Sequence, residues 1–408
     1  MLRRLRSAIS LLRGNLGLMT ITSGLWNFAG QMVWPFSSLY YLALGASYLD
    51  LGLLSAIWSA CSVFPLIIGG YMTDRFGRKK LVVSLSFGLS LINLFLAVVP
   101  SWEYLIPIMA LDGFISGLRD PAFSAIIADS TKPEVRALGF AIWNFGPVLF
   151  GMFSPYIAGR LLDEMGIVAS MRLLYLILFV FSFTACLLRL LFLKETLISS
   201  GVKRMALTSI IRDGLLIVLK FPGKILTLFA VSALSYLVFG LADPFWITYA
   251  TRDVIGLTAA QWGLILIIQT ASKLTLTPIL AYVSDRFGRV KLLISSLFIS
   301  AFAPVFFTLS SSFEQTIISL MLYAVCIGVS SITLSALLTD FIPRDMRGRA
   351  AAFQGTLNQV AFMLGSIVGG YTYQNISKSY PFYLAFFSLI FASMLTFLFV
   401  EEPEVKAE

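Results

Sequence analysis

Long apolar stretches make up most of the chain, and short polar segments separate them. Many of the stretches reach about 20 residues, the length that crosses a bilayer as a helix. The sequence lacks the short alternating segments that a transmembrane barrel needs. We therefore expect an all-helical integral membrane protein. The predicted spans are twelve: 16–42, 48–73, 80–100, 104–130, 137–162, 171–193, 225–250, 260–284, 291–311, 314–340, 349–372 and 380–400.

The composition fits a membrane protein and narrows its chemistry. The chain is 58% hydrophobic, only 12% charged and contains no histidine. Catalysis, metal ligation and proton relay by histidine are therefore excluded. Cys61, Cys186 and Cys326 lie singly in separate predicted helices, so neither a disulfide framework nor a metal site is expected. The G-x-x-x-x-G-K-[ST] motif of nucleotide-binding proteins does not occur.

The two halves of the chain repeat each other. The segments Asp74–Arg78 and Asp285–Arg289 both read DRFGR and lie 211 positions apart. The same offset pairs Asp129 with Asp340. Internal repeats of about half a chain are typical of secondary transporters. We expect an N-terminal bundle of six helices over 1–193, a cytoplasmic linker over 194–224 and a C-terminal bundle of six helices over 225–408.

Basic residues predict how the chain lies in the membrane. Most of the 30 Lys and Arg fall at the chain ends or in alternate loops that include the two DRFGR segments and the linker. This asymmetry predicts that both termini are cytoplasmic. We expect the protein in the plasma (inner) membrane. The net charge of +9 is a topology signal, and no nucleic-acid-binding motif occurs. The stretch 206–219 within the linker is amphipathic enough to lie on anionic lipid.

The DRFGR segments resemble the loop signature of the major facilitator superfamily, G-x-x-x-D-R-x-G-R-[RK]. The resemblance implies a transporter that rocks two bundles about a central cavity, and a charged latch that releases during transport. In the second copy, Ala281 and Val290 depart from the pattern. The residues assigned to the latch are Gly70, Asp74, Arg75, Gly77, Arg78, Asp129, Asp285, Arg286, Gly288, Arg289 and Asp340.

Within the latch, acids and bases recur at one offset, so pairing inside each half is expected. Arg78 can bridge to Asp129 at the end of the fourth span, and Arg289 to Asp340. The alternative is that these charges only anchor the loops in the headgroup region.

Two cations fall deep inside predicted spans. Arg119 precedes Asp129 by ten residues, roughly 15 Å along a helix, and Lys273 lies about 18 Å from Asp285. Both therefore approach the midplane, where this fold binds its substrate. Arg119 and Lys273 are our main substrate-binding candidates. The alternative for Arg119 is an internal salt bridge with Asp112 or Asp120; for Lys273 it is a structural ion pair.

Intramembrane carboxylates are the candidates for carrying protons. Asp112, Asp243 and Asp120 lie within predicted spans, where desolvation favours the protonated form. Asp243 precedes Pro244, so it can equally cap a broken helix.

Three amides extend the predicted substrate site: Gln31, Gln269 and Asn358. A buried amide needs a partner, so interhelical hydrogen bonding without a substrate role is the alternative.

Gly146–Pro147 resembles an incomplete copy of a motif found in exchangers of the same superfamily. A helix kink that serves packing alone is the alternative explanation.

We expect a secondary active transporter rather than an enzyme. Its predicted function is proton-coupled export of small lipophilic organic compounds by alternating access. The alternative is proton-coupled transport of an organic or inorganic anion held by Arg119 and Lys273. We expect no cofactor beyond the proton gradient and no metal. The expected partners are a small-molecule substrate, protons and membrane lipids, and the family suggests a monomer.

Overall fold

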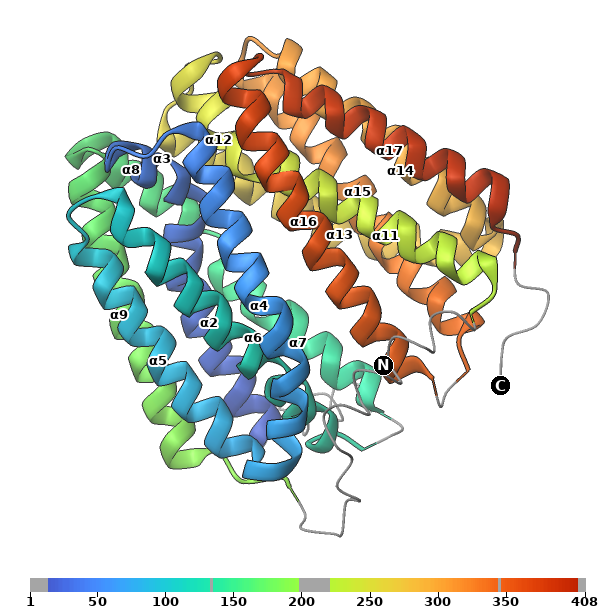
Figure 1. Ribbon diagram of the computed structural model, residues 1–408, viewed down its shortest axis with the longest axis horizontal. Helices are drawn as coiled ribbons and strands as arrows, with labels where there is room; N and C mark the ends of the chain where they lie inside the picture. Colours follow the sequence, from blue (N-terminus) through green and yellow to red (C-terminus); the bar gives the residue numbers. More distant parts are fainter. Residues whose placement is uncertain (1–13, 133–134, 198–220, 344–345, 403–408) are drawn as a thin grey trace. The chain divides into compact units, whose positions relative to one another are not determined.

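The computed structural model describes residues 14–132, 135–197, 221–343 and 346–402, and all regular structure in these ranges is helical (Figure 1). Each of the twelve predicted spans coincides with a helix or with a run of consecutive helices. The stretch 206–219, predicted to be amphipathic, lies outside the described residues. In the first half the elements are α2 (Asn15–Val33), η1 (Trp34–Phe36), α3 (Ser37–Ala43), α4 (Tyr48–Phe76), α5 (Arg78–Val98), η2 (Trp102–Tyr104), α6 (Leu105–Asp129), α7 (Arg136–Gly151), α8 (Ser154–Met165) and α9 (Ile167–Phe192). In the second half they are α11 (Gly223–Ala242), η4 (Asp243–Phe245), α12 (Trp246–Thr248), η5 (Tyr249–Asp253), α13 (Ala259–Phe287), α14 (Arg289–Leu309), α15 (Phe313–Phe341), α16 (Arg347–Asn375) and α17 (Tyr380–Phe399).

Among the described residues, nine helical segments are long and apolar enough to cross a membrane. The remaining three predicted spans correspond to α2 with α3, to α6 and to α16. In α6 the charges of Asp112, Arg119 and Asp120 lower the apolar character of the helix. The residues that suggest function thus also weaken the hydropathy signal of the element that carries them.

Prolines interrupt three spans that the sequence predicted as continuous. The first span breaks at η1, which contains Pro35, and the seventh breaks at η4, which contains Pro244. The fifth span divides into α7 and α8, and Pro155 stands in the first turn of α8. Proline lacks an N–H group and its ring clashes with the preceding turn, which favours a break at these three places. Pro121 and Pro147 lie inside α6 and α7 without ending them. Pro35 and Pro244 occupy equivalent places in the two halves.

Contacts divide the chain into two compact units with the same internal arrangement. One unit comprises Met1–Ala46 and Ala60–Arg204, and the other comprises Ser47–Ser59 and Met205–Glu408. In the first, α2 packs on α7 and α9, and α5 packs on α6 and α9. In the second, α11 packs on α16 and α17, and α14 packs on α15 and α17 (Figure 1). The sequence repeat is therefore also a repeat of packing, although Ser47–Ser59 joins the second unit.

Glycines allow close helix crossings inside each unit. A Cβ atom on Gly117 of α6 would lie 2.4 Å from the carbonyl oxygen of Ser62 on α4. In the second unit, a Cβ on Gly365 of α16 would lie 2.2 Å from the carbonyl oxygen of Leu237 on α11. No side chain fits at these points. Small residues let membrane helices approach closely, because van der Waals contact drives their association.

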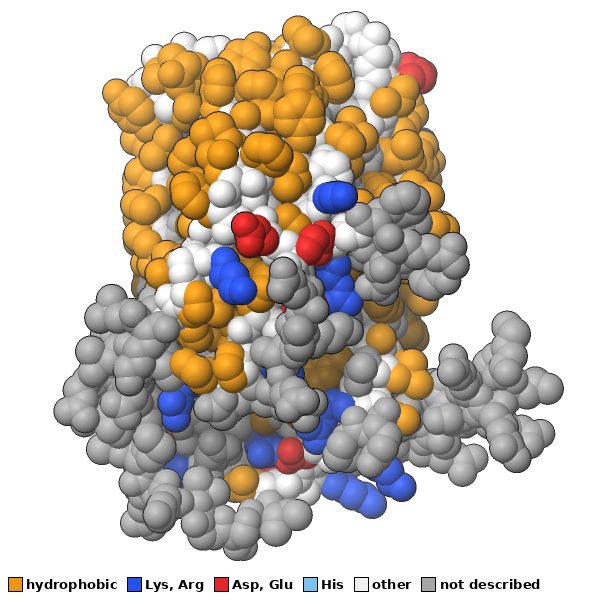
Figure 2. All heavy atoms as spheres, turned by 90° about the vertical axis from the view of Figure 1, so that its right-hand side faces the viewer, with side chains coloured by type: hydrophobic (Ala, Val, Ile, Leu, Met, Phe, Trp, Pro, Cys, Tyr) orange, Lys and Arg blue, Asp and Glu red, His pale blue; other side chains and the backbone are white. Residues whose placement is uncertain are grey.

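One face of the molecule shows where apolar and basic side chains gather. On the face shown in Figure 2, hydrophobic side chains cover the upper part, and Lys and Arg side chains gather in the lower part. Exposed large apolar side chains such as Phe387, Phe397 and Leu309 are expected where lipid is the solvent.

Candidate functional site

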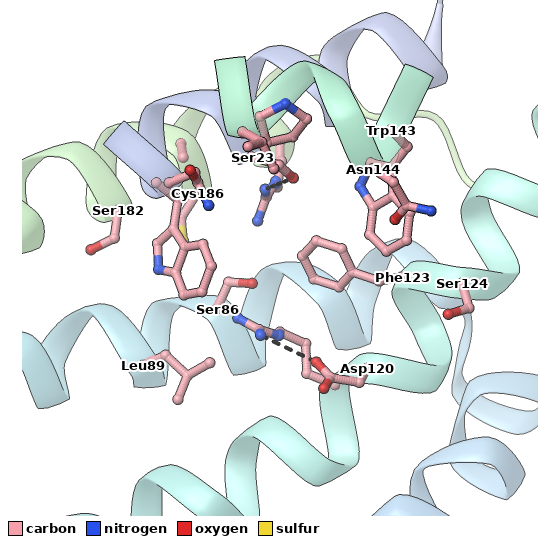
Figure 3. A pocket seen from close by; sticks show the side chains of 17 residues that line it. Ser23, Ser86, Leu89, Asp120, Phe123, Ser124, Trp143, Asn144, Ser182 and Cys186 are labelled. Atoms are coloured by element: carbon pink, nitrogen blue, oxygen red, sulfur yellow. Dashed lines mark hydrogen bonds and ion pairs between the residues drawn. The ribbon is translucent and has the colours of Figure 1, made fainter. Parts of the chain in front are cut away.

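The first unit holds a cavity of about 370 Å³ between α2, α5, α6, α7 and α9 (Figure 3). Figure 3 shows the Phe123 ring pointing into the cavity between Ser86 and Trp143. The wall combines aromatic rings, hydroxyl groups and two guanidinium groups. It is lined by Ser23, Trp26, Asn27, Ser86, Leu89, Arg119, Asp120, Phe123, Ser124, Trp143, Asn144, Pro147, Val148, Ser182, Ala185, Cys186 and Arg189.

Arg119, the predicted substrate residue of the first half, lines this cavity. Its Nη2 atom lies 3.2 Å from Oδ1 of Asp120, one of the two acids that the salt-bridge alternative named. Its guanidinium also lies 4.9 Å from the centroid of the Phe123 ring and 5.7 Å from that of Trp26. Since the Asp120 side chain is 60% exposed, it is a weakly held partner for a buried cation.

Arg189 of α9 also lines the cavity, although it was not among the residues predicted from the sequence. It is only 4% exposed. Its Nε donates to the hydroxyl of Thr22 at 2.9 Å, and its Nη2 donates to the hydroxyl of Ser23 at 3.2 Å. The guanidinium lies 4.8 Å from the centroid of Phe123. Its position, an arginine between leucines inside an apolar span, was the signal available in the sequence.

The predicted carboxylates occupy different surroundings. Asp112 is half-buried on α6 and takes part in interactions there. Asp243 begins η4, where the helix is interrupted, and its side chain is exposed. Both stay candidates for carrying protons.

The predicted polar residues of the second unit lie on α13 and α16. Lys273 is exposed, its stem lies beside Gly328 of α15, and no described carboxylate forms an ion pair with it. Gln269 donates to the carbonyl of Leu320 at 3.4 Å. Asn358 is 7% exposed, and its Oδ1 has no hydrogen-bond partner among the described residues. Gln269 therefore forms an interhelical hydrogen bond, as expected if its role is structural. The Oδ1 atom of Asn358 remains available as an acceptor among the described residues.

Gln31, the predicted amide of the first unit, is half-buried on α2. Its side chain lies against Gly151 at the end of α7, outside the cavity wall. A substrate role for Gln31 stays a prediction.

The DRFGR segments form equivalent turns in both units. Gly77 has φ 95° and Gly288 has φ 100°, a left-handed conformation that favours glycine. Arg78 forms an ion pair with Asp129, and Arg289 forms one with Asp340. These pairs exist inside each unit, as the repeated acids and bases suggested, and their role as a latch stays a prediction.

Other members of the predicted latch differ in their surroundings. Arg75 is exposed and donates to the hydroxyl of Tyr71 at 3.2 Å. A Cβ atom on Gly70 would meet no atom within 4 Å. The side chains of Asp74, Asp285 and Arg286 lie outside the described part of the structure.

Two further carboxylates complete these turns. Glu195, just after α9, accepts hydrogen bonds from the backbone N–H groups of Arg78 and Lys79, each at 3.1 Å. Glu402 accepts from the N–H of Val290 at 2.7 Å in the second unit. Burial raises the pKa of Glu195. The N–H groups of Arg78, Lys79, Thr196 and Leu197 lower it more, so the pKa lies below its usual value. The signal in the sequence was an acid two residues after the sixth and the twelfth spans.

A second cluster of polar groups lies in the second unit around Asp253, at the end of η5. Its carboxylate accepts from the hydroxyls of Tyr48 at 2.5 Å and Tyr373 at 2.7 Å, and Lys378 Nζ lies 3.2 Å away. Asp253 is only 5% exposed. These bonds hold the start of α4 against α16 and η5.

Comparison with known proteins identifies the family. The profile described as Major Facilitator Superfamily matches residues 19–229 and 228–408, which is nearly the whole chain. The chain belongs to the major facilitator superfamily. This membership confirms the fold class, and it makes the protein a multi-pass membrane transporter and not an enzyme.

Relatives in the superfamily include proteins of drug efflux. The chain is 26% identical over 385 residues to the multidrug resistance protein MdtG of Enterobacter lignolyticus, covering 91% of this chain and 88% of that one. It is 25% identical over 350 residues to the multi-drug resistance efflux pump PmrA of Streptococcus pneumoniae, covering 85% and 81%. The inward-open xylose transporter XylE of E. coli shares the fold with a TM-score of 0.72 at 15% identity, covering 95% and 96%.

Proposed function

We propose that this superfamily member is a secondary active exporter of small amphipathic organic compounds, driven by the inward movement of protons. The observation that carries the proposal is the cavity of about 370 Å³ in the first unit, whose walls combine aromatic rings with a few polar groups. Ligand sites have this character, with volumes of about 300–1,000 Å³. The efflux names of MdtG and PmrA support export.

The proposed coupling residues are the carboxylates Asp112, Asp120 and Asp243. Carboxylates inside membrane spans are costly and mark proton pathways. Asp120 faces the cavity and pairs with Arg119, so substrate and proton can compete for one arginine. We place the protein in the plasma membrane because its relatives are bacterial efflux proteins. We place both termini in the cytoplasm because Lys and Arg gather at the chain ends and in alternate loops. We propose that it acts as a monomer.

The alternative is proton-coupled transport of an anion held by Arg119 and Lys273. The two arginines of the cavity favour anions. Lys273 lies in the other unit, and it is a candidate there because no described carboxylate forms an ion pair with it.

Internal pH in dye-loaded proteoliposomes tests the proposed exchange. We expect added tetraphenylphosphonium or 2-naphthoate to trigger a proton flux in the wild type. Asp112→Asn and Asp243→Asn should lower this flux at least tenfold if those residues carry the proton. Glu164→Gln, an exposed acid on α8, is the matched control and should behave as the wild type. Substrate movement without any proton flux would contradict the coupling.

A further inference from the structure

The cavity of the first unit carries more positive than negative charge. Arg119 and Arg189 both line it, and Asp120 is the one carboxylate in the described wall. Arg189 is bonded to two neutral hydroxyls, and no described carboxylate forms an ion pair with it. A cation held within a membrane span without a counter-charge costs several kcal/mol. A bound anion would remove that cost.

Hydrogen-bond donors on the wall also lack acceptors. Trp143 Nε1, Arg119 Nε and Ser86 Oγ are buried and have no partner among the described residues. All three residues line the cavity. Buried donors are normally satisfied, so an unpaired set around one cavity indicates a missing acceptor. Asn27 Oδ1 is a buried acceptor of the wall that also lacks a partner among the described residues, and the Ser86 hydroxyl can accept as well as donate.

The rings of the wall match an aromatic ligand body. Phe123 contacts both guanidinium groups, and its ring centroid lies 6.4 Å from that of Trp143. Figure 3 shows Phe123 reaching into the cavity. Aromatic rings pack well beside such side chains, while guanidinium groups hold carboxylates and similar oxyanions by paired hydrogen bonds.

We propose that this cavity binds an aromatic organic oxyanion, with Arg189 as the residue that determines charge specificity and Arg119 as its second partner. The inference rests on the proposed transport function for its purpose, but the binding step is independent of transport. It differs from the Arg119 and Lys273 pairing because both of its cations lie in one unit.

The competing explanation is structural. Arg189 joins α9 to Thr22 and Ser23 of α2, so it could serve only to hold these helices together. In that case its removal would lower stability and weaken all ligands alike. A specificity residue instead changes the ratio between charged and neutral ligands, which is the readout to measure.

The first experiment uses the wild-type protein in lipid nanodiscs and three probes of one shape. Calorimetric titration compares 2-naphthoate, 2-naphthamide and 2-naphthylmethylammonium. We expect the naphthoate to bind at least tenfold more tightly than the amide and the ammonium probe to bind weakest. Equal affinities, tighter binding of the ammonium probe, or no naphthoate binding at 1 mM would each overturn the proposal.

Variants then assign the effect to Arg189. Arg189→Gln should weaken naphthoate about tenfold and change the amide less than twofold, whereas Arg189→Lys should retain most of the preference. Arg160→Gln, an exposed arginine on α8 outside the cavity, is the control. If Arg189→Gln does not fold, the preference for naphthoate over the amide is measured in Arg119→Gln and in the wild type instead. Equal weakening of naphthoate and amide would support the structural explanation instead.

This binding test separates the two proposals. Naphthoate preference without substrate-driven proton flux would leave the inference standing and remove the transport coupling. Proton-coupled export of cations without a preference for naphthoate would support the transport proposal and overturn the oxyanion site.

Discussion

Glu195 and Glu402 show how one carboxylate can organise the start of a membrane helix. Glu195 accepts two backbone N–H groups at the first turn of α5, and Glu402 accepts the N–H of Val290 at the first turn of α14. The unpaired N–H groups and the dipole of a helix start favour a negative charge there. Each carboxylate also lies over the glycine that turns the chain, at Gly77 or Gly288. The turn and the helix start are therefore stabilised together.

Glu195 should make stability depend on pH. Its pKa is lowered in the folded protein by backbone N–H groups, so its contribution is full above the unfolded pKa of about 4.3. That contribution is lost as the pH falls through the lower folded pKa. We expect Glu195→Gln to lower the melting temperature at pH 7 by about 3 °C. The difference in melting temperature between Glu195→Gln and the wild type should become smaller below about pH 4.3. Melting in detergent between pH 7 and pH 3.5 measures this, and a constant gap would contradict it.

The Arg289–Asp340 ion pair offers a second residue-scale test. The side chains are 23% and 11% exposed, so removing one partner leaves a largely desolvated charge. We expect Asp340→Asn to cost about 2 kcal/mol and the double variant Arg289→Gln/Asp340→Asn to cost less than the sum of the single variants. Melting temperatures of the four proteins complete the cycle. Additive losses would show that the pair is not coupled.

At the scale of helices, the close crossings depend on glycines with backbone atoms opposite them. Gly240 on α11 faces the backbone of α16, and Gly365 on α16 faces the backbone of α11. Added Cβ atoms there would lie 2.2 Å from the carbonyl oxygens of Phe362 and Leu237. Because these obstacles are backbone, the helices themselves must move to accept a side chain.

Gly365→Ala should therefore destabilise the second unit. We expect a loss of about 2–3 kcal/mol, which is the cost of overpacking a tight contact. Thermal stability followed by size-exclusion chromatography measures it. Gly223→Ala is the matched control, since a Cβ at Gly223 meets no atom within 4 Å. If Gly365→Ala melts with the wild type, α11 and α16 have more freedom than these contacts allow.

At the scale of the whole molecule, α4 is shared between the two units. Its first residues belong to the unit formed mainly by the second half, while the rest belong to the first unit. Asp253 holds the start of α4 through Tyr48, and Gln374 accepts from the N–H of Leu49 at 2.8 Å. The boundary between units thus runs through a helix, and not only through the linker.

Weakening the Asp253 cluster should loosen the first part of α4, residues 48–59. We expect Asp253→Asn to speed amide hydrogen exchange in residues 47–59 by about tenfold, because a hydrogen bond to a charged group is worth about 1.5 kcal/mol. Lys378→Gln should have a smaller effect, since Lys378 is 43% exposed. Mass spectrometry of the exchanged peptides measures both. Unchanged exchange in Asp253→Asn would show that other contacts hold this segment.

The sequence predicted much of the fold and part of the site. The DRFGR repeat indicated two equivalent halves. The recurrence of Arg78 and Asp129 as Arg289 and Asp340 at the same offset indicated ion pairs that are present. Arg119 was found because it interrupts an apolar span. Arg189 also interrupts an apolar span, but it was missed because hydropathy does not show which way a side chain on a helix points. Glu195 was missed because the sequence alone does not show that an acid just after the sixth span lies beside Gly77.

The sequence by itself determined the helical class, the spans, the repeat and the family. This is so because a lipid environment forces each spanning backbone to satisfy its own hydrogen bonds, and length and hydropathy then suffice. The tertiary structure alone decided that Arg119, Arg189 and Phe123 share one cavity, and that Asp253 binds Tyr48 from 205 positions away. Those contacts depend on how each helix is rotated about its axis, which is fixed by packing between helices and not by the hydropathy of any one of them.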